Sequence, residues 1–201
     1  MIRVLLADDQ ALVRGAIAAL LELEGDIEVV AQVGRGDQVV TAATESMADV
    51  AMLDIEMPGL DGIEAAAQLQ RDMPSCRVLI VTTFGRPGYL RRALEAGATG
   101  FMVKDAPAAT LAEAVRRVHA GLRVVDPDLA VESLSSGTNP LSNREREVLR
   151  AARDGAPVRE VAKRMFLSPG TVRNHLSSAI GKTGTQTRAE AIQVAEANGW
   201  L

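Results

Sequence analysis

The chain has 201 residues, a net charge of −4 and 47% hydrophobic residues, which is typical of a packed globular protein with one or two domains. Aromatic residues make up only 2%, so the core must be built mainly from aliphatic side chains. A single cysteine, Cys76, excludes an intramolecular disulfide and suits a reducing compartment. We find no secretion signal and no apolar stretch approaching the roughly 18 residues of a membrane span, so we expect a cytoplasmic protein without membrane contact.

Charge is distributed unevenly along the chain. Residues 1–121 hold 11 Lys and Arg against 17 Asp and Glu, whereas residues 141–201 hold 10 against 6. Between them, residues 122–140 contain two prolines and a Ser-Ser-Gly-Thr run, which predicts a linker with a short helical turn at 128–134. The composition therefore indicates an acidic domain, a linker and a basic domain, and a basic domain is one sign of contact with nucleic acid.

In the first domain, short apolar runs alternate with segments of helical periodicity. The strands are expected at 2–7, 27–33, 49–53, 76–82 and 100–104, and the helices at 10–24, 36–46, 62–72, 88–97 and 107–121. Because the strands are apolar along their whole length, both of their faces should be buried. This pattern predicts an α/β fold with a doubly wound, five-stranded parallel sheet that has helices on both faces.

The second domain is predicted to be all-helical. Capping boxes at 142–145 and 187–190 begin two helices, and a Ser-Pro pair at 168–169 begins another. Four helices are expected, at 142–153, 158–167, 169–182 and 188–198. Gly181 lies inside the third of these, which should weaken the end of that helix.

Polar side chains lie at the carboxyl ends of four of the five predicted strands. Asp8 and Asp9 directly follow the first strand and Asp54 the third, whereas Thr82 and Lys104 are the last residues of the fourth and fifth. Each residue alone has an ordinary explanation, such as a helix cap, a turn residue or a surface lysine. Ligand sites of open parallel sheets, however, form at the carboxyl ends of the strands. Together these residues predict one site with three carboxylates, a hydroxyl and an ammonium.

These groups suit phosphoryl transfer. Crowded carboxylates repel one another, and a Mg²⁺ ion, which prefers oxygen ligands, would relieve the repulsion. Asp54 could then stay ionised and attack a phosphorus atom. The metal and Lys104 would neutralise the phosphoryl oxygens, and Thr82 would hydrogen-bond one of them.

Four motifs in this domain resemble those of receiver domains in two-component response regulators: ADD at 7–9, LDIEMPGLDG at 53–62, VTT at 81–83 and GFMVKD at 100–105. The resemblance covers residues 1–121 and implies a flavodoxin-like fold. It also implies that a sensor histidine kinase phosphorylates Asp54, and that the domain assists only its own phosphoryl transfer and hydrolysis.

The same resemblance implies roles for the surrounding residues. The Mg²⁺ ligands would be Asp8, Asp9, Asp54 and the backbone carbonyl of Glu56, with Asp8 acting mainly through water. Lys104 would bind the phosphoryl group. Thr82 and Phe101 would form a switch pair, in which the hydroxyl turns to the phosphoryl group and the aromatic ring rotates inward.

The third helix of the second domain has an apolar and a polar face. The residues that should face the core are Val172, Leu176, Ala179, Ile180 and Thr183. Arg173, Asn174 and Ser177 fall on the other side, where Arg can read guanine and Asn adenine. With the preceding helix, this arrangement predicts a helix-turn-helix.

The stretches LSNREREVL, VAKRMFLSPGTVRNHL and RAEAI resemble the LuxR/NarL-type DNA-binding domain, over residues 140–195. The resemblance implies that Thr171 and Lys182 touch DNA phosphates, and that Arg173, Asn174 and Ser177 read bases. Both domains together resemble the NarL/FixJ family of response regulators, and TTFGRPGYLRRALEAG is similar to its DesR branch.

We therefore expect a non-enzymatic transcription factor that dimerises on phosphorylation and binds double-stranded promoter DNA. The helices at 10–24 and 107–120 are the preferred dimer interface, and the surface at 88–105 is the alternative. Two other functions remain open. Haloacid-dehalogenase-type phosphatases use similar groups, although their second Asp corresponds to Glu56 here. A constitutive DNA-binding protein with an inactive receiver is the other.

Overall fold

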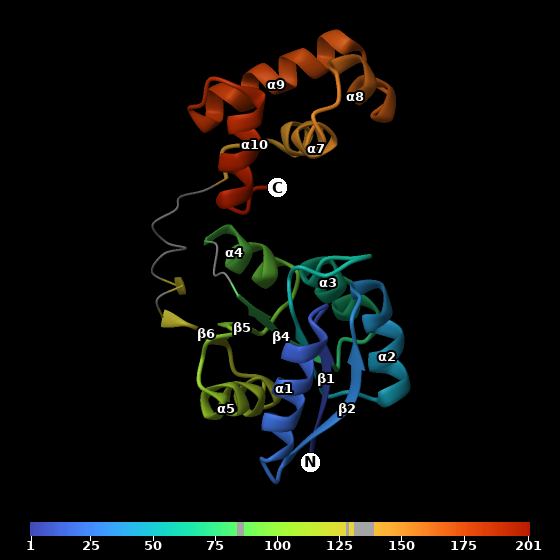
Figure 1. The fold of residues 1–201 in the computed structure, drawn as a ribbon, viewed down its shortest axis with the longest axis vertical. Helices are drawn as coiled ribbons and strands as arrows, with labels where there is room; N and C mark the ends of the chain where they lie inside the picture. Colours follow the sequence, from blue (N-terminus) through green and yellow to red (C-terminus); the bar gives the residue numbers. More distant parts are fainter. Residues whose placement is uncertain (84–86, 128, 131–138) are drawn as a thin grey trace. The chain divides into compact units, whose positions relative to one another are not determined.

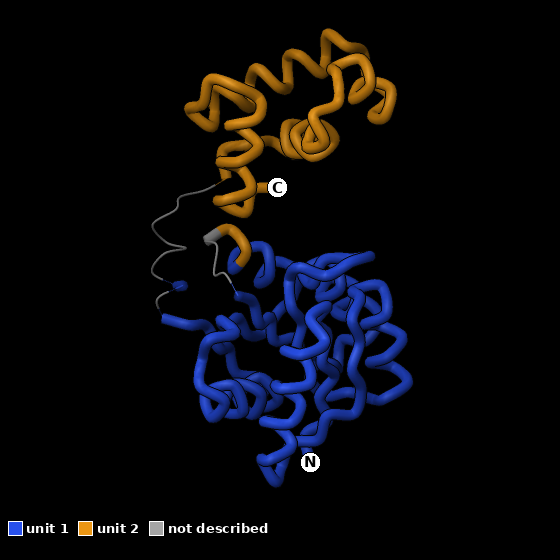
Figure 2. Tube along the Cα trace, viewed as in Figure 1, with its two compact units in different colours: residues 1–85, 90–131 blue, residues 86–89, 132–201 orange. Residues whose placement is uncertain are grey.

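The computed structural model describes residues 1–83, 87–127, 129–130 and 139–201. The chain divides into two compact units, coloured in Figure 2. Residues 1–85 and 90–131 form the first, called the sheet unit here, and residues 86–89 and 132–201 form the second, called the helical unit. No helix in the described ranges is long and apolar enough to cross a membrane.

The sheet unit is built on a parallel sheet with the strand order β2-β1-β3-β4-β5-β6 (Figure 1). The strands are β1 (Ile2–Ala7), β2 (Ile27–Val33), β3 (Val50–Leu53), β4 (Arg77–Thr82), β5 (Gly100–Val103) and β6 (Val124–Val125). The predicted doubly wound parallel sheet is confirmed. Because the strand order reverses between β1 and β3, a crevice for ligands is expected at the carboxyl ends of these two strands.

The sheet has six strands rather than the five predicted. Val124 and Val125, which fall in the predicted linker, pair with Gly100 and Phe101 at the edge of the sheet. A strand of two residues is too short to produce a periodic pattern, and its sequence context of Arg, Asp and Pro indicated a loop. The helical turn predicted at 128–134 falls largely outside the described residues.

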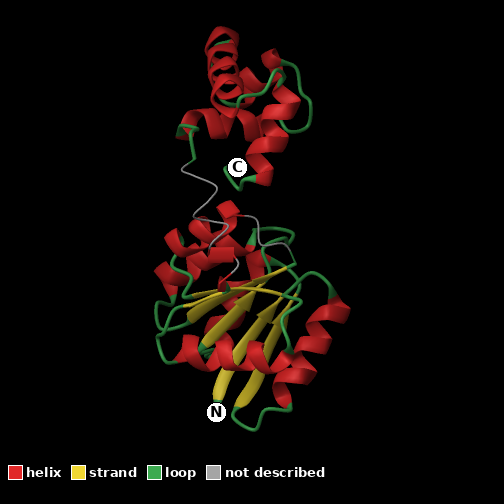
Figure 3. Cartoon of the chain, turned by 90° about the vertical axis from the view of Figure 1, so that its left-hand side faces the viewer, coloured by secondary structure: helices red, strands yellow, loops and turns green. Residues whose placement is uncertain are grey.

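Helices cover both faces of the sheet (Figure 3). On one face lie α1 (Ala11–Glu22) and α5 (Ala108–His119), and on the other lie α2 (Val39–Ser46) and α3 (Gly62–Asp72); α4 (Pro87–Glu95) links β4 to β5. The helix predicted at 36–46 begins as a 3₁₀ turn, η1 (Gly36–Gln38).

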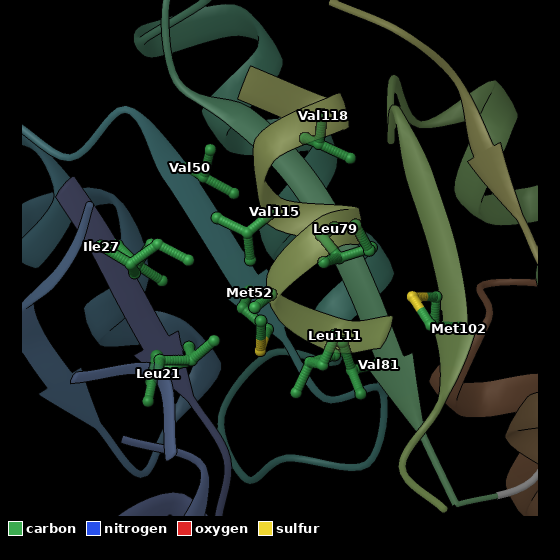
Figure 4. Close-up of a cluster of buried hydrophobic side chains, with 14 of the residues drawn as sticks. Leu21, Ile27, Val50, Met52, Leu79, Val81, Met102, Leu111, Val115 and Val118 are labelled. Atoms are coloured by element: carbon green, nitrogen blue, oxygen red, sulfur yellow. The ribbon is translucent and has the colours of Figure 1, made fainter. Parts of the chain in front are cut away.

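The core beneath α5 is aliphatic, as the composition required. Figure 4 shows the apolar side of α5 lying on the sheet between α1 and β5. The residues of this contact that are almost fully buried include Val50, Met52, Leu79 and Val81 from the strands and Leu111, Val115 and Val118 from the helix.

The helical unit contains α7 (Asn143–Ala151), α8 (Val158–Arg164), α9 (Pro169–Thr183) and α10 (Arg188–Ala197). The capping boxes predicted at 142–145 and 187–190 are both present. α8 ends three residues earlier than predicted, because the chain turns through Phe166, whose φ is 55°. α9 runs through Gly181 to Thr183 and is followed by Gly184 as its C-cap, in a left-handed conformation.

Candidate functional site

Asp8, Asp9 and Asp54 meet at the carboxyl ends of β1 and β3, where the strand order reverses. One carboxylate oxygen of each residue lies within 4.8 Å of the others. Asp8 and Asp54 are buried, whereas Asp9 is exposed. The Asp54 backbone NH donates to the Ala7 carbonyl (2.8 Å), so the pairing of the two strands brings the acids together. Three of the predicted metal ligands therefore share one site.

Lys104 bridges the two buried carboxylates. Its Nζ lies 2.7 Å from Asp8 Oδ2 and 3.1 Å from Asp54 Oδ2, and only 7% of its side chain is exposed. The Lys104 backbone NH donates to the Thr82 carbonyl (2.8 Å), which holds the residue at the end of the β4–β5 pair. The peptide bond that follows Lys104 is trans. One ammonium between two carboxylates leaves the buried part of the site with an excess of negative charge.

The surroundings of Asp54 act on its pKa in opposite directions. Burial raises the pKa above its usual value, and the hydrogen bond and charge of Lys104 lower it, while the nearby Asp8 raises it further. The net direction is upward. The Ile55 backbone NH also donates to Asp54 Oδ1 (2.8 Å), which fixes the carboxylate.

The predicted switch residues lie on neighbouring strands. Thr82 ends β4 with its side chain buried, and Phe101 pairs with Ile80 one strand along. The Phe101 ring is already buried, with 0% exposure. Glu56, whose backbone carbonyl is the predicted metal ligand, has an exposed side chain in the loop between β3 and α3.

Sequence reasoning missed two residues at this site. A Cβ atom at Gly62 would lie 1.9 Å from the Asp54 carbonyl oxygen, so a glycine is needed where α3 begins beside Asp54. Arg14 donates to the Asp8 carbonyl and lines the small hollow that Lys104 also borders. The Asp-Gly pair at 61–62 was a visible turn signal, but no pattern separates Arg14 from a surface cation.

The outer face of α9 is confirmed as solvent-exposed. Arg173, Asn174 and Ser177 are exposed, and the buried side of the helix consists of Val172, Leu176 and Ala179. Thr171 lies in the first turn, with its hydroxyl 2.8 Å from that of the capping Ser168. The helix therefore presents three adjacent polar side chains that could enter a groove of DNA.

Lys182 has a partner within the helical unit. Its Nζ lies 2.8 Å from Oε2 of Glu145, a residue of α7 that is only 4% exposed. The Glu145 carboxylate also accepts hydrogen bonds from the Ser178 hydroxyl and the Ser142 backbone NH, both at 2.6 Å. Burial alone would raise the pKa of Glu145, but these bonds, led by that from Lys182, lower it to about 2. Glu145 therefore ties α9 to α7 as a carboxylate.

Comparison with known proteins assigns both units. Residues 4–116 match the family model of the response regulator receiver domain, and residues 139–195 match that of bacterial regulatory proteins of the luxR family. The chain belongs to the two-component response regulators that carry a LuxR-type DNA-binding domain. This family consists of transcriptional regulators rather than classical enzymes, so the phosphatase alternative has no support.

Individual relatives extend over the whole chain. It is 42% identical over 201 residues to the transcriptional regulatory protein DesR of Bacillus subtilis (strain 168), with 100% of both chains covered. The crystal structure of the response regulator ChrA of a heme-sensing two-component system is 36% identical, with a TM-score of 0.60 and 97% and 96% of the two chains covered. A structure of two RcsB dimers bound to two parallel DNAs is 25% identical, with a TM-score of 0.68 and 98% of each chain covered.

Proposed function

We propose that a sensor histidine kinase phosphorylates Asp54 in the cytoplasm, and that the phosphorylated chain dimerises and binds promoter DNA through α9. The observation that carries this proposal is the position of Asp54, buried beside Asp8 and Asp9 and in contact with Lys104. A buried acid that needed only to be neutralised would not require two further acids at the same strand ends.

In the proposed reaction, a carboxylate oxygen of Asp54 forms a bond to phosphorus while the bond between phosphorus and the donor's histidine nitrogen breaks. Lys104 is close enough to Asp54 to bind an incoming phosphoryl oxygen. Thr82, buried at the end of the next strand, would hydrogen-bond another of these oxygens. The same groups would assist the later hydrolysis of the acyl phosphate. Phosphoryl transfer to Asp54 and this hydrolysis are the only reactions assigned to the chain.

The acidic cluster fits a Mg²⁺ ion. Three carboxylate oxygens from Asp8, Asp9 and Asp54 lie together, and only Asp9 is exposed, which leaves one open side for water ligands. The proposed ligands are Asp9, Asp54 and the Glu56 carbonyl, with Asp8 acting mainly through water. When bound, the metal would supply positive charge to the transferring phosphoryl group.

The exposed apolar residues of α1 favour the α1/α5 surface as the dimer interface. Leu12 and Leu23 are 86% and 82% exposed, and at 100° per residue they lie with Ala19 on one side of the helix, opposite the buried Leu21. Arg116 of α5 already pairs with Asp26 (2.8 Å), so its charge supports the fold of one subunit. A dimer would bury these leucines without breaking that pair.

For DNA binding, we assign base contacts to Arg173, Asn174 and Ser177, which are exposed in a row on α9. Thr171 and Lys182, near the two ends of the helix, would contact phosphates. A single helical unit offers few base contacts, so two copies should read two half-sites about one helical turn apart.

The proposal is tested by intact-mass spectrometry after incubation with a small phosphodonor and Mg²⁺. We expect one added phosphate on the wild type and none on Asp54→Ala or after chelation of the metal. Asp105→Ala removes an exposed acid outside the cluster and should still be phosphorylated. Labelling that survives in Asp54→Ala would refute the assignment, and DNA binding that is equal with and without phosphate would support the inactive-receiver alternative.

A further inference from the structure

A polar hollow of about 520 Å³ lies at the amino-terminal ends of the strands. Asp54 lies at the opposite, carboxyl ends. Three arginines from three elements line the hollow. Arg71 lies in the last turn of α3, Arg77 is the first residue of β4, and Arg123 directly precedes β6. Thr99, Gln70 and one acid, Glu95, are the other polar residues of the lining.

These three arginines differ from most cations of the sheet unit. Among the residues that the structure describes, none of them makes an ion pair or a side-chain hydrogen bond. By contrast, a carboxylate partner is present for Arg35, Arg92, Lys104 and Arg116. The sheet unit contains more acidic than basic residues, yet these three guanidinium groups have no carboxylate partner among the described residues. Grouped around one hollow, they repel one another.

We propose that this hollow, which we call the arginine pocket, binds a small anion that carries two or more linked phosphate groups. Each guanidinium offers a planar fork of donors that matches phosphate oxygens, and charge-assisted bonds of this kind are among the strongest hydrogen bonds in proteins. Three guanidinium groups from three separate segments offer more donors and more positive charge than one phosphate group needs. The single carboxylate leaves the pocket with a net charge of +2, which selects against a cation or a neutral ligand.

The size of the hollow supports a ligand of this class. Its volume falls within the roughly 300–1,000 Å³ of small-molecule sites, which is larger than a single phosphate requires. Its polar lining argues against an apolar ligand. The arginine pocket and the acidic cluster lie at opposite ends of the parallel strands. The phosphate ligand of the pocket and the phosphoryl group on Asp54 would therefore not compete for one site.

The test is isothermal titration calorimetry of the full chain with tripolyphosphate and with inorganic phosphate, in buffer without divalent metal. We expect saturable binding of one tripolyphosphate per chain and much weaker binding of phosphate. Arg71→Gln, Arg77→Gln and Arg123→Gln should each weaken tripolyphosphate binding by about tenfold or more, as expected for the loss of one charge-assisted contact.

Two control variants separate the arginine pocket from general attraction by positive charge. Arg117→Gln removes an exposed arginine of α5 that does not line the pocket, and Arg144→Gln removes an exposed arginine of α7 that does not line it either. Arg117→Gln and Arg144→Gln should both bind tripolyphosphate like the wild type. Equal losses in the pocket variants and the controls, phosphate binding as tight as that of tripolyphosphate, or no saturable binding at all would each overturn the proposal.

Discussion

Replacing Glu145 by Gln should destabilise the helical unit strongly at neutral pH and hardly at all in acid. The side chain of Glu145 is 5% exposed, and its carboxylate accepts bonds from α9 through Lys182 and Ser178 and from the start of α7 through Ser142. Glutamine keeps the shape and one acceptor oxygen but loses the charge, so Lys182 is left with no anionic partner.

The size of the effect follows from the pKa of Glu145. Hydrogen bonds lower it from 4.5 to about 2 in the folded chain, against the opposing effect of burial. At about 1.4 kcal/mol per unit, the ionised form stabilises the fold by up to roughly 3 kcal/mol. Because the folded-state pKa is the lower one, this contribution is complete above pH 5 and disappears as the pH falls towards 2.

The chain contains a convenient probe for this measurement. Trp200 is its only tryptophan and packs against the core of the helical unit. Urea unfolding followed by tryptophan fluorescence therefore reports on this unit. The free energy of unfolding of Glu145→Gln should be about 3 kcal/mol lower than that of the wild type at pH 7, and the difference should shrink as the pH is lowered below 4.

Glu147→Gln is the matched control. It makes the same chemical change on α7, but Glu147 is 46% exposed and, among the residues that the structure describes, forms an ion pair only with Arg144 (2.6 Å) at the surface. Such pairs contribute about 0–1 kcal/mol, so this variant should unfold close to the wild type. If the two variants lose the same small amount, or if the loss in Glu145→Gln is independent of pH, the carboxylate does not hold α9 to α7 in the way described.

Three further predictions concern the other sites. Lys104→Ala should destabilise the sheet unit by roughly 3–5 kcal/mol, because it leaves two buried carboxylates without their ammonium, and Mg²⁺ should restore part of the loss in a thermal melt; equal losses with and without metal would contradict this. In salt titrations of DNA binding, Arg173→Ala should cost about 1–3 kcal/mol per half-site and relax sequence preference; an Arg173→Ala protein with intact preference would refute that contact. Lys182→Ala should weaken all sequences alike and reduce the salt slope by about one per copy, measured at a temperature where Trp200 fluorescence shows the helical unit folded, because the variant also loses the ion pair with Glu145. Leu12→Asp should keep the phosphorylated chain monomeric in light scattering, while Met47→Asp, an exposed control on another surface, should dimerise, and dimers of both would exclude the α1 surface.

Much of the fold was predictable because the signals are local and repeated. Apolar runs and helical periodicity located the first five strands, and the capping boxes located the starts of α7 and α10 within a residue or two. β6 was missed because two residues cannot show a period, and pairing with β5 rather than intrinsic preference makes it a strand. The early end of α8 depends on a left-handed residue, Phe166, whose type gives no warning of that conformation.

At the candidate site, the acids and Lys104 could be found because topology alone brings the carboxyl ends of parallel strands together. Residues that matter because of a close backbone approach, or because of a partner far away in the sequence, could not be found from the sequence. Gly62 is needed only because its helix begins against the Asp54 backbone, and the partnership of Glu145 with Lys182 joins residues of two helices. Sequence showed Glu145 as a capping residue, which it is, but not as the anchor of α9.

The free energy needed to shift the chain from its inactive to its active state limits which interactions can drive that change. Moving an inactive-to-active ratio from 1:99 to 99:1 takes about 5.5 kcal/mol of differential stabilisation. Burial of the Phe101 ring can supply none of this starting from the described structure, because the ring is already at 0% exposure. The phosphoryl group adds about −1.5 to −2 charges, and charge-assisted bonds to Lys104 and Thr82 would be worth roughly 1.5–3 kcal/mol each. Lys104 must, however, share its charge with Asp8 and Asp54, so its bond should be worth about 1.5 kcal/mol, the lower value, and the two bonds then sum to at most about 4.5 kcal/mol, short of the requirement. A metal ion at the acidic cluster then has to contribute to the switch itself, and removing it from an already phosphorylated chain should weaken the dimer.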